Sequence, residues 1–265
     1  MQKIVFNAHY LMYFDTAISD YWRAVYVPYE EAMLMLEGDL YVKKATLEFH
    51  ASACFDHRLD VMLRCDRIGN SSIVFTGAIF RGDEVLVTSE LIYVFAEPSS
   101  QTAKSVPDAL RQVLLGYEKG AAACSVKTGS WAELGMHAAQ IRTEVFVQEQ
   151  KIPLEMEWDE ADKTALHAVA YNGLGQAIGT ARLLQASPVV AKVGRMAVKR
   201  VLRGSHIGRD LLATLTDVAK RQGCLEVMLH AQSSAQGFYS RAGFFARGEV
   251  FDEVDIPHIE MFKTL

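Results

Sequence analysis

The hydrophobic positions near the start of the chain repeat with the period of an α-helix. From Ala8 to Val25, apolar residues recur at steps of three and four, which places them on one face of a long amphipathic helix. These positions are Tyr10, Phe14, Ala17, Ile18, Tyr21, Trp22 and Val25. The short apolar run Ile4–Phe6 that precedes the helix is typical of the end of a strand.

After Pro28 the pattern changes to runs rich in Val, Ile, Leu and Phe, which are typical of strands. The runs are Tyr41–Cys54, Leu59–Ile68, Ser72–Phe80 and Val85–Phe95. Short polar or glycine-containing segments separate them. We therefore predict one helix followed by four antiparallel strands in a meander, and then a short helix over Asp108–Leu115.

A linker is predicted within Gly116–Ser130, where small residues, charges and two glycines interrupt the periodicity. Beyond it, helices and strands alternate. The expected elements are a strand at Cys124–Thr128, a helix at Trp131–Gln148, strands at His167–Asn172, Ala177–Leu184 and Val189–Val198, a helix at Ile207–Gln222, a strand at Leu225–Leu229, a helix at Ser233–Ala242 and two final strands. No internal repeat is apparent, so we predict two different folds in an α+β chain, with domains at residues 1–118 and 119–265.

Composition and charge narrow the classes of partner. Half of the 265 residues are hydrophobic, and the formal net charge of −5 gives no general attraction to nucleic acid or anionic lipid. No run approaches the roughly 20 apolar residues that cross a bilayer. The four cysteines (Cys54, Cys65, Cys124 and Cys224) show no metal-ligand spacing. We therefore predict a cytoplasmic protein with reduced thiols, no nucleic-acid or membrane partner and no metal site.

The first half of the chain resembles a known family. The segments IVFNAHYLMYFDTA, RIGNSSIVFTGAIF and LIYVFAEPSSQTAKSVPDALR are similar to the 4-hydroxybenzoyl-CoA thioesterase family of hotdog-fold thioesterases, from Met1 to about Leu115. The resemblance implies an antiparallel sheet around a long helix, a homodimer, and hydrolysis of acyl-CoA thioesters at the subunit interface. In that family an aspartate ahead of the helix acts as nucleophile or base, and the amides at the helix start polarise the thioester carbonyl.

The aligned aspartate position falls immediately before Met1, and Lys3 stands where the family usually has glycine. Two explanations are open. The first, which we favour, is that Met1 is an internal methionine of a longer chain, because loss of an edge strand would expose unpaired backbone. The second is that this hotdog is a degenerate acyl-binding and dimerising module. Asn7 aligns with the helix start, where a catalytic role for its amide and a simple capping role are both open.

Two motifs in the second half carry a second resemblance. VGRMAVKRVLRGSHIGRDLL places a strand, a basic loop and a helix in succession, and the free amides of such a helix start can bind a pyrophosphate. LHAQSSAQGFYSRAGF gives a strand, a polar break and a short helix that carries Tyr239. Together with IRTEVFVQEQKIP and IPHIEMFK, they resemble the ElaA-like branch of the GNAT N-acetyltransferase superfamily, from about Cys124 to the end.

The GNAT resemblance implies a mixed α/β sheet that splays at its middle, with coenzyme A between the strand ending at Val198 and the strand at Leu225–Leu229. Tyr239 is implied as the acid that protonates the leaving thiolate. His206 stands where the family usually has glycine. The residues implied to bind acetyl-CoA are Met196, Ala197 and Val198 along the pantetheine arm, and Arg203, Gly204, Ser205, His206, Ile207, Gly208 and Arg209 around the pyrophosphate.

The general base is left open by the sequence. The candidates are Glu144, Glu149, Asp159, Glu160, His167, Glu253 and His258. Arg142 and Trp158 are expected near the acceptor pocket, and the acidic stretch Leu154–Ala165 is either a solvated loop or a rim that attracts a cationic amine. We predict a bifunctional protein that hydrolyses acyl-CoA in its first half and transfers an acetyl or acyl group to an unidentified amine in its second. The alternative is a single acetyltransferase whose hotdog is a non-catalytic scaffold for dimerisation and acyl binding.

Overall fold

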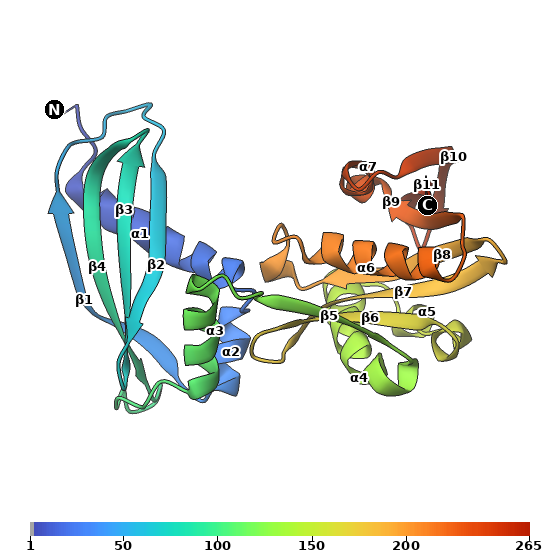
Figure 1. Cartoon of the computed structure of the whole chain (residues 1–265), viewed down its shortest axis with the longest axis horizontal. Coiled ribbons are helices and arrows are strands. Elements are labelled where there is room, and N and C mark those ends of the chain that lie inside the picture. Colours follow the sequence, from blue (N-terminus) through green and yellow to red (C-terminus); the bar gives the residue numbers. More distant parts are fainter. Residues whose placement is uncertain (1–2) are drawn as a thin grey trace. The chain divides into compact units, whose positions relative to one another are not determined.

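The computed structural model describes residues 3–265, and it divides into two compact units between Ala123 and Cys124 (Figure 1). The aspartate position and strand expected ahead of Met1 lie outside the described residues. Glu118 belongs to the first unit, because its carboxylate accepts hydrogen bonds from the Tyr21 hydroxyl at 2.7 Å and the Cys65 amide at 2.8 Å. No described helix is both long enough and apolar enough to cross a bilayer.

The first unit is a four-stranded antiparallel sheet with a long helix against it, as the hotdog resemblance implied (Figure 1). Its elements are α1 (Asn7–Ala24), α2 (Tyr29–Met35), β1 (Asp39–Phe49), β2 (Asp60–Ile68), β3 (Ser72–Arg81), β4 (Glu84–Ala96) and α3 (Asp108–Glu118). The predicted apolar stripe of α1 is buried at Tyr10, Phe14 and Ile18. A Cβ on Gly77 of β3 would lie 2.7 Å from the Phe14 ring, so glycine there lets helix and sheet approach closely.

Two local predictions for this unit are wrong. The strand order is β1-β4-β3-β2, so β1 pairs with β4 and only β2 to β4 form a meander. The connection from β1 to β2 packs over the start of α1 instead of forming a hairpin: the amide of Val5 donates to the carbonyl of Ala53, and the amide of Ala53 donates to the Tyr10 hydroxyl. Helix α2 follows Pro28, where only strands were expected, because seven residues are too few to show a helical period.

The second unit is a seven-stranded mixed sheet in the order β10-β11-β9-β8-β7-β6-β5. Its elements are β5 (Cys124–Gly129), α4 (Trp131–Arg142), the π-helix η1 (Thr143–Glu149), α5 (Leu154–Glu157), η2 (Glu160–Lys163), β6 (Leu166–Asn172), β7 (Ala177–Ser187), β8 (Val190–Val198), η3 (Arg200–Leu202), α6 (Ile207–Arg221), β9 (Glu226–Gln232), η4 (Ser233–Ala235), α7 (Gln236–Arg241), β10 (Phe245–Glu253) and β11 (Ile256–Thr264). Helix α4 packs on Val169, whereas α6 packs on Gly179, so the two helices cover opposite faces (Figure 1).

The sheet splays between β8 and β9, as predicted. These strands are parallel, and they pair only from Val190 to Val193, opposite Glu226 to Leu229. Beyond this point β8 pairs with β7 alone, and β9 pairs with β11. Register shifts between Thr180 and Arg182, so Arg195 and Met196 bulge opposite a single residue of β7, and Arg195 adopts a left-handed φ of 48°.

Candidate active site

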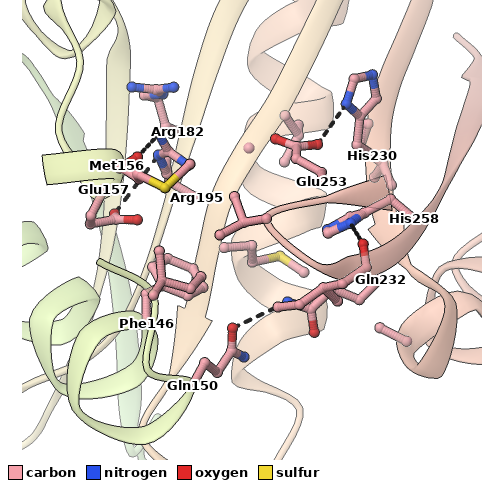
Figure 2. A pocket seen from close by; sticks show the side chains of 18 of the residues that line it. Phe146, Gln150, Met156, Glu157, Arg182, Arg195, His230, Gln232, Glu253 and His258 are labelled. Atoms are coloured by element: carbon pink, nitrogen blue, oxygen red, sulfur yellow. Dashed lines mark hydrogen bonds and ion pairs between the residues drawn. The ribbon is translucent and has the colours of Figure 1, made fainter. Parts of the chain in front are cut away.

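Two cavities meet where the sheet splays. The first, of about 590 Å³, lies against the loop that precedes α6, and we call it the loop cavity. The second, of about 370 Å³, lies between β8 and the end of β9 and is called the gap cavity (Figure 2). Met196, Ala235 and Tyr239 line both cavities, so the two spaces are continuous at these residues.

The loop cavity gathers eight of the ten residues predicted to bind coenzyme A, together with Tyr239. The eight are Met196, Val198, Arg203, Gly204, His206, Ile207, Gly208 and Arg209. Ala197 does not line it, because its side chain packs in the core beneath α4. Ser205 does not line it either, and its amide donates to the carbonyl of Leu202 at 3.3 Å.

The start of α6 faces this cavity with unused amides. The first intrahelical bond runs from the amide of Asp210 to the carbonyl of His206, so the amides of Ile207, Gly208 and Arg209 precede it. Such a helix start carries partial positive charge and binds phosphate groups. The geometry therefore fits a diphosphate, as the sequence implied.

His206 is the N-cap residue of α6 and adopts a left-handed φ of 69°. Glycine is the residue favoured in this conformation, and a side chain there costs about 1 kcal/mol. The departure from the usual family pattern is therefore accommodated by a strained backbone, and the imidazole becomes part of the cavity lining.

Arg203 is held in place by Glu149 of η1. Its two terminal nitrogens donate to the two carboxylate oxygens, each at 2.7 Å, and its Nε donates to the carbonyl of Val198 at 3.2 Å. The hydrogen bonds from Arg203 lower the pKa of Glu149. Glu149 therefore anchors the loop. It lines neither cavity, whereas a general base would have to reach the substrate.

Tyr239 lies on α7 at the junction of the two cavities. Its ring packs edge-on against Phe238 and Phe244, with centroid distances of 5.0 and 6.2 Å. Burial raises the pKa of Tyr239 to about 12, so the hydroxyl stays protonated at neutral pH. None of the described residues accepts a hydrogen bond from it, which leaves this proton for a ligand.

The structure separates the seven base candidates into two groups. Asp159, Glu253 and His258 line the gap cavity. The other four are engaged elsewhere: Glu144 with buried Lys199, Glu149 with Arg203, Glu160 with Lys163, and His167 with the carbonyl of Asp162. Asp159 is a poor base, because the hydrogen bonds from Arg182 lower its pKa to about 2.

His258 lines the gap cavity, and one of its ring nitrogens is held by the backbone (Figure 2). Its Nδ1 lies 2.7 Å from the carbonyl oxygen of Ile256. A carbonyl only accepts, so Nδ1 carries the proton and the lone pair of the neutral ring is on Nε2. The Phe251 ring stacks on the imidazole with 6.2 Å between the ring centroids, and this contact helps to fix the plane of the imidazole.

Arg142 and Trp158 line neither cavity, contrary to the expectation that they shape the acceptor pocket. The Arg142 guanidinium is 1% exposed and lies 4.6 Å from the centre of the Trp158 ring. It donates to the carboxylates of Glu157 and Asp162. These residues brace the wall of the gap cavity from behind.

Among the polar residues of the gap cavity that sequence reasoning missed are Lys192 on β8 and His230 on β9. The Lys192 ammonium lies 3.4 Å from both ring nitrogens of His230, whose Nδ1 lies 3.2 Å from a carboxylate oxygen of Glu253. Each is a polar side chain that follows apolar residues within its strand, and that interruption was the available signal.

In the first unit, Asn7 is the first residue of α1 and is exposed, and Phe6 is the N-cap residue. No side-chain hydrogen bond caps this helix, so the capping role considered for Asn7 is absent. The first backbone bond of the helix runs from His9 to Phe6, which leaves the amides of Asn7 and Ala8 unused. The first turn holds no acidic residue.

The splayed parallel pair, the helix start facing the loop cavity and the tyrosine at the junction define a coenzyme A-dependent acyltransferase fold. Residues 132–265 match the acetyltransferase (GNAT) domain, and residues 2–88 match the thioesterase superfamily. The chain belongs to the GNAT acetyltransferase family and joins this acetyltransferase domain to a thioesterase-like domain.

Individual relatives cover the second unit. The uncharacterised N-acetyltransferase YjcF of Bacillus subtilis is 32% identical over 48% of this chain and 89% of its own length. Protein ElaA of Escherichia coli is 34% identical over 48% of this chain and 84% of its own length. A solved structure described as a candidate N-acetyltransferase from Lactobacillus plantarum is 28% identical, with a TM-score of 0.51, over 54% of this chain and 99% of its own.

Proposed function

We propose that the second unit transfers an acetyl group from acetyl-CoA to an amine, with the coenzyme in the loop cavity and the amine in the gap cavity. One observation carries this assignment: Met196 and Tyr239 line both cavities, so a thioester at the end of the first cavity meets a nucleophile from the second. We also propose residues 119–265 as the extent of this functional domain and residues 1–118 as that of the other.

The reaction follows from the positions of three groups. The amine nitrogen attacks the thioester carbonyl, the C–N bond forms, and the C–S bond breaks. Nε2 of His258 takes the proton of the amine, and the Tyr239 hydroxyl donates to the leaving thiolate. The bulge at Arg195 and Met196 leaves one residue outside the β-ladder. We propose that its amide binds the oxyanion.

We expect His258→Ala to lower kcat for acetyl transfer by about 10²-fold, because the amine then loses its proton acceptor. Release of free CoA with a panel of primary amines measures the rate. Added imidazole should restore part of it in this variant. His137→Ala is the matched control, since His137 pairs with Tyr171 and lines neither cavity. Wild-type kcat in His258→Ala would refute the role.

Acyl-CoA hydrolysis in the first unit is our second proposal. It is favoured by the match to the thioesterase superfamily and by the unused amides at the start of α1, which can bind a thioester oxygen. The resemblance implies that this unit works as a homodimer. The alternative is that the unit binds acyl groups and holds two copies together without hydrolysis.

A single assay separates these two roles. In the Tyr239→Phe variant, where transfer is disabled, we expect a panel of acyl-CoA esters to release CoA in the absence of any amine. The acyl chain that gives the fastest release identifies the preferred substrate. Release that requires an amine, and that disappears in Tyr239→Phe, would support the scaffold role instead. Light scattering of the same sample measures the expected dimer.

A further inference from the structure

Arg195 occupies an unusual position on the wall of the gap cavity. It lies in the bulge of β8, next to Met196 at the junction of the cavities, and its φ of 48° is left-handed. Such a conformation is costly for a side chain other than glycine, and it persists where the surrounding structure imposes it. The bulge places the side chain on the wall of the acceptor space, where a quarter of it remains exposed (Figure 2).

The hydrogen-bonding capacity of this guanidinium is only partly used. One terminal nitrogen of Arg195 donates to a carboxylate oxygen of Asp159 at 3.1 Å and to the carbonyl of Met156 at 3.4 Å. Its Nε is buried without a hydrogen-bond partner and lies 3.8 Å from the carboxylate of Glu157. The buried Nε of Arg182, on the same wall, also lacks a partner among the described residues.

The carboxylates of this wall are already neutralised. Both oxygens of Asp159 accept from Arg182, at 2.6 and 2.9 Å, and Glu157 pairs with buried Arg142. The acidic stretch that could have attracted a cationic amine therefore has no free carboxylate on this wall. Across the cavity, Lys192 and Glu253 both contact His230 and offset each other in charge.

We infer that the acceptor is an amine that also carries a carboxylate, and that Arg195 binds this carboxylate. The inference rests on the proposed acetyl transfer. The other terminal nitrogen of Arg195 has no partner among the described residues and is the donor left for this carboxylate, and hydrogen bonds between two charged groups are the strong ones. With its carboxylate held beside the bulge, the substrate presents its amine toward the thioester at Met196. Amines without the anionic group gain no ion pair with Arg195, which keeps only its contacts with Asp159 and Glu157.

The test compares ω-amino acids of two to six carbons with their primary amides, which differ only in this charge. The kcat/KM values are calculated for the unprotonated amine, so that the different basicities cancel. We expect wild type to prefer the carboxylate by at least about tenfold at the best chain length. In Arg195→Gln this ratio should fall to near one. Arg221→Gln, which removes the same charge from the exposed end of α6, should leave the ratio unchanged.

Two further measurements make every outcome decisive. Calorimetric affinity for acetyl-CoA shows whether Arg195→Gln keeps its fold. A ratio near one in wild type, or an unchanged ratio in Arg195→Gln, overturns the inference while the proposed transfer stands. Transfer to none of the amines overturns the proposed function. In that case the inference is tested by binding alone: the CoA complex of wild type should bind the best-binding amino acid more tightly than that of Arg195→Gln, and equal affinities would overturn the inference.

Discussion

Tyr239→Phe is expected to lower kcat for acetyl transfer by about 10² to 10⁴-fold while the affinity for acetyl-CoA changes by less than about twofold. The substitution removes one hydroxyl from the junction of the two cavities and leaves the ring in its contacts with Phe238 and Phe244. Without this proton donor, CoA must leave as an unprotonated thiolate. Steady-state release of CoA gives kcat, and calorimetry gives the affinity.

The control is Tyr171→Phe, because the Tyr171 hydroxyl pairs with His137 and lines neither cavity. It should keep wild-type kcat. The raised pKa of Tyr239, about 12, also fixes the alkaline behaviour: the acid form persists at neutral pH, and its loss should slow the reaction only as pH approaches that value. A Tyr239→Phe enzyme with more than half the wild-type kcat would remove Tyr239 from the mechanism.

Asp162→Asn should destabilise the second unit by about 3–5 kcal/mol, the usual cost of removing one partner from a buried ion pair. The Asp162 carboxylate is 5% exposed and accepts from Arg142 at 2.8 Å and from Arg182 at 2.7 Å. Asparagine has nearly the same shape, but it removes the negative charge that the two buried guanidiniums share. Urea denaturation of the full chain, followed by tryptophan fluorescence, measures the loss, since Trp131 and Trp158 flank Arg142.

Asp217→Asn on the exposed face of α6 is the matched control and should change the free energy of unfolding by less than about 0.5 kcal/mol. The pH dependence has a definite sign. Burial opposes ionisation of Asp162, but the hydrogen bonds from Arg142 and Arg182 outweigh it and lower its pKa. The stability from this carboxylate is therefore complete above its ordinary pKa, near 4, and is lost as pH falls further. The Asp162→Asn variant should lose less stability than wild type over this acid range.

Long periodic segments were the predictable part of the fold. The amphipathic stripe of α1 and the apolar runs of β2, β3 and β4 gave elements within a residue or two of those observed. Strand order was not predictable, because the segment between β1 and β2 packs on α1 through bonds that no local pattern encodes. The helix predicted to end at Gln148 changes to a π-helix at Thr143, since its apolar spacing alone does not distinguish the two helix types.

The coenzyme-binding residues were foreseen where they are contiguous in sequence, as in Arg203 to Arg209, because a strand, loop and helix start place them together. The acceptor side was foreseen only in part: His258 was among the seven base candidates, whereas Lys192 and His230 were not singled out. Lys192, His230 and His258 come from three strands, and only the splay of the sheet brings them to one cavity. The ion pairs that neutralise Asp159 and Glu157 depend on Arg182 and Arg142, which are distant in sequence. The acidic stretch therefore suggests, from sequence alone, a negative electrostatic potential. In the folded protein, arginines that are distant in sequence neutralise it.

Only four residue pairs join β8 to β9, and the two strands separate beyond them. Continuing the ladder past Val193 and Leu229 would draw Gly194 and His230 to the normal interstrand spacing of about 4.8 Å and fill the space between them. The separation of β8 and β9 therefore controls the binding of donor and acceptor together. Sequence changes that extend the pairing of these two strands are expected to abolish the binding of both substrates, even where every binding residue is preserved.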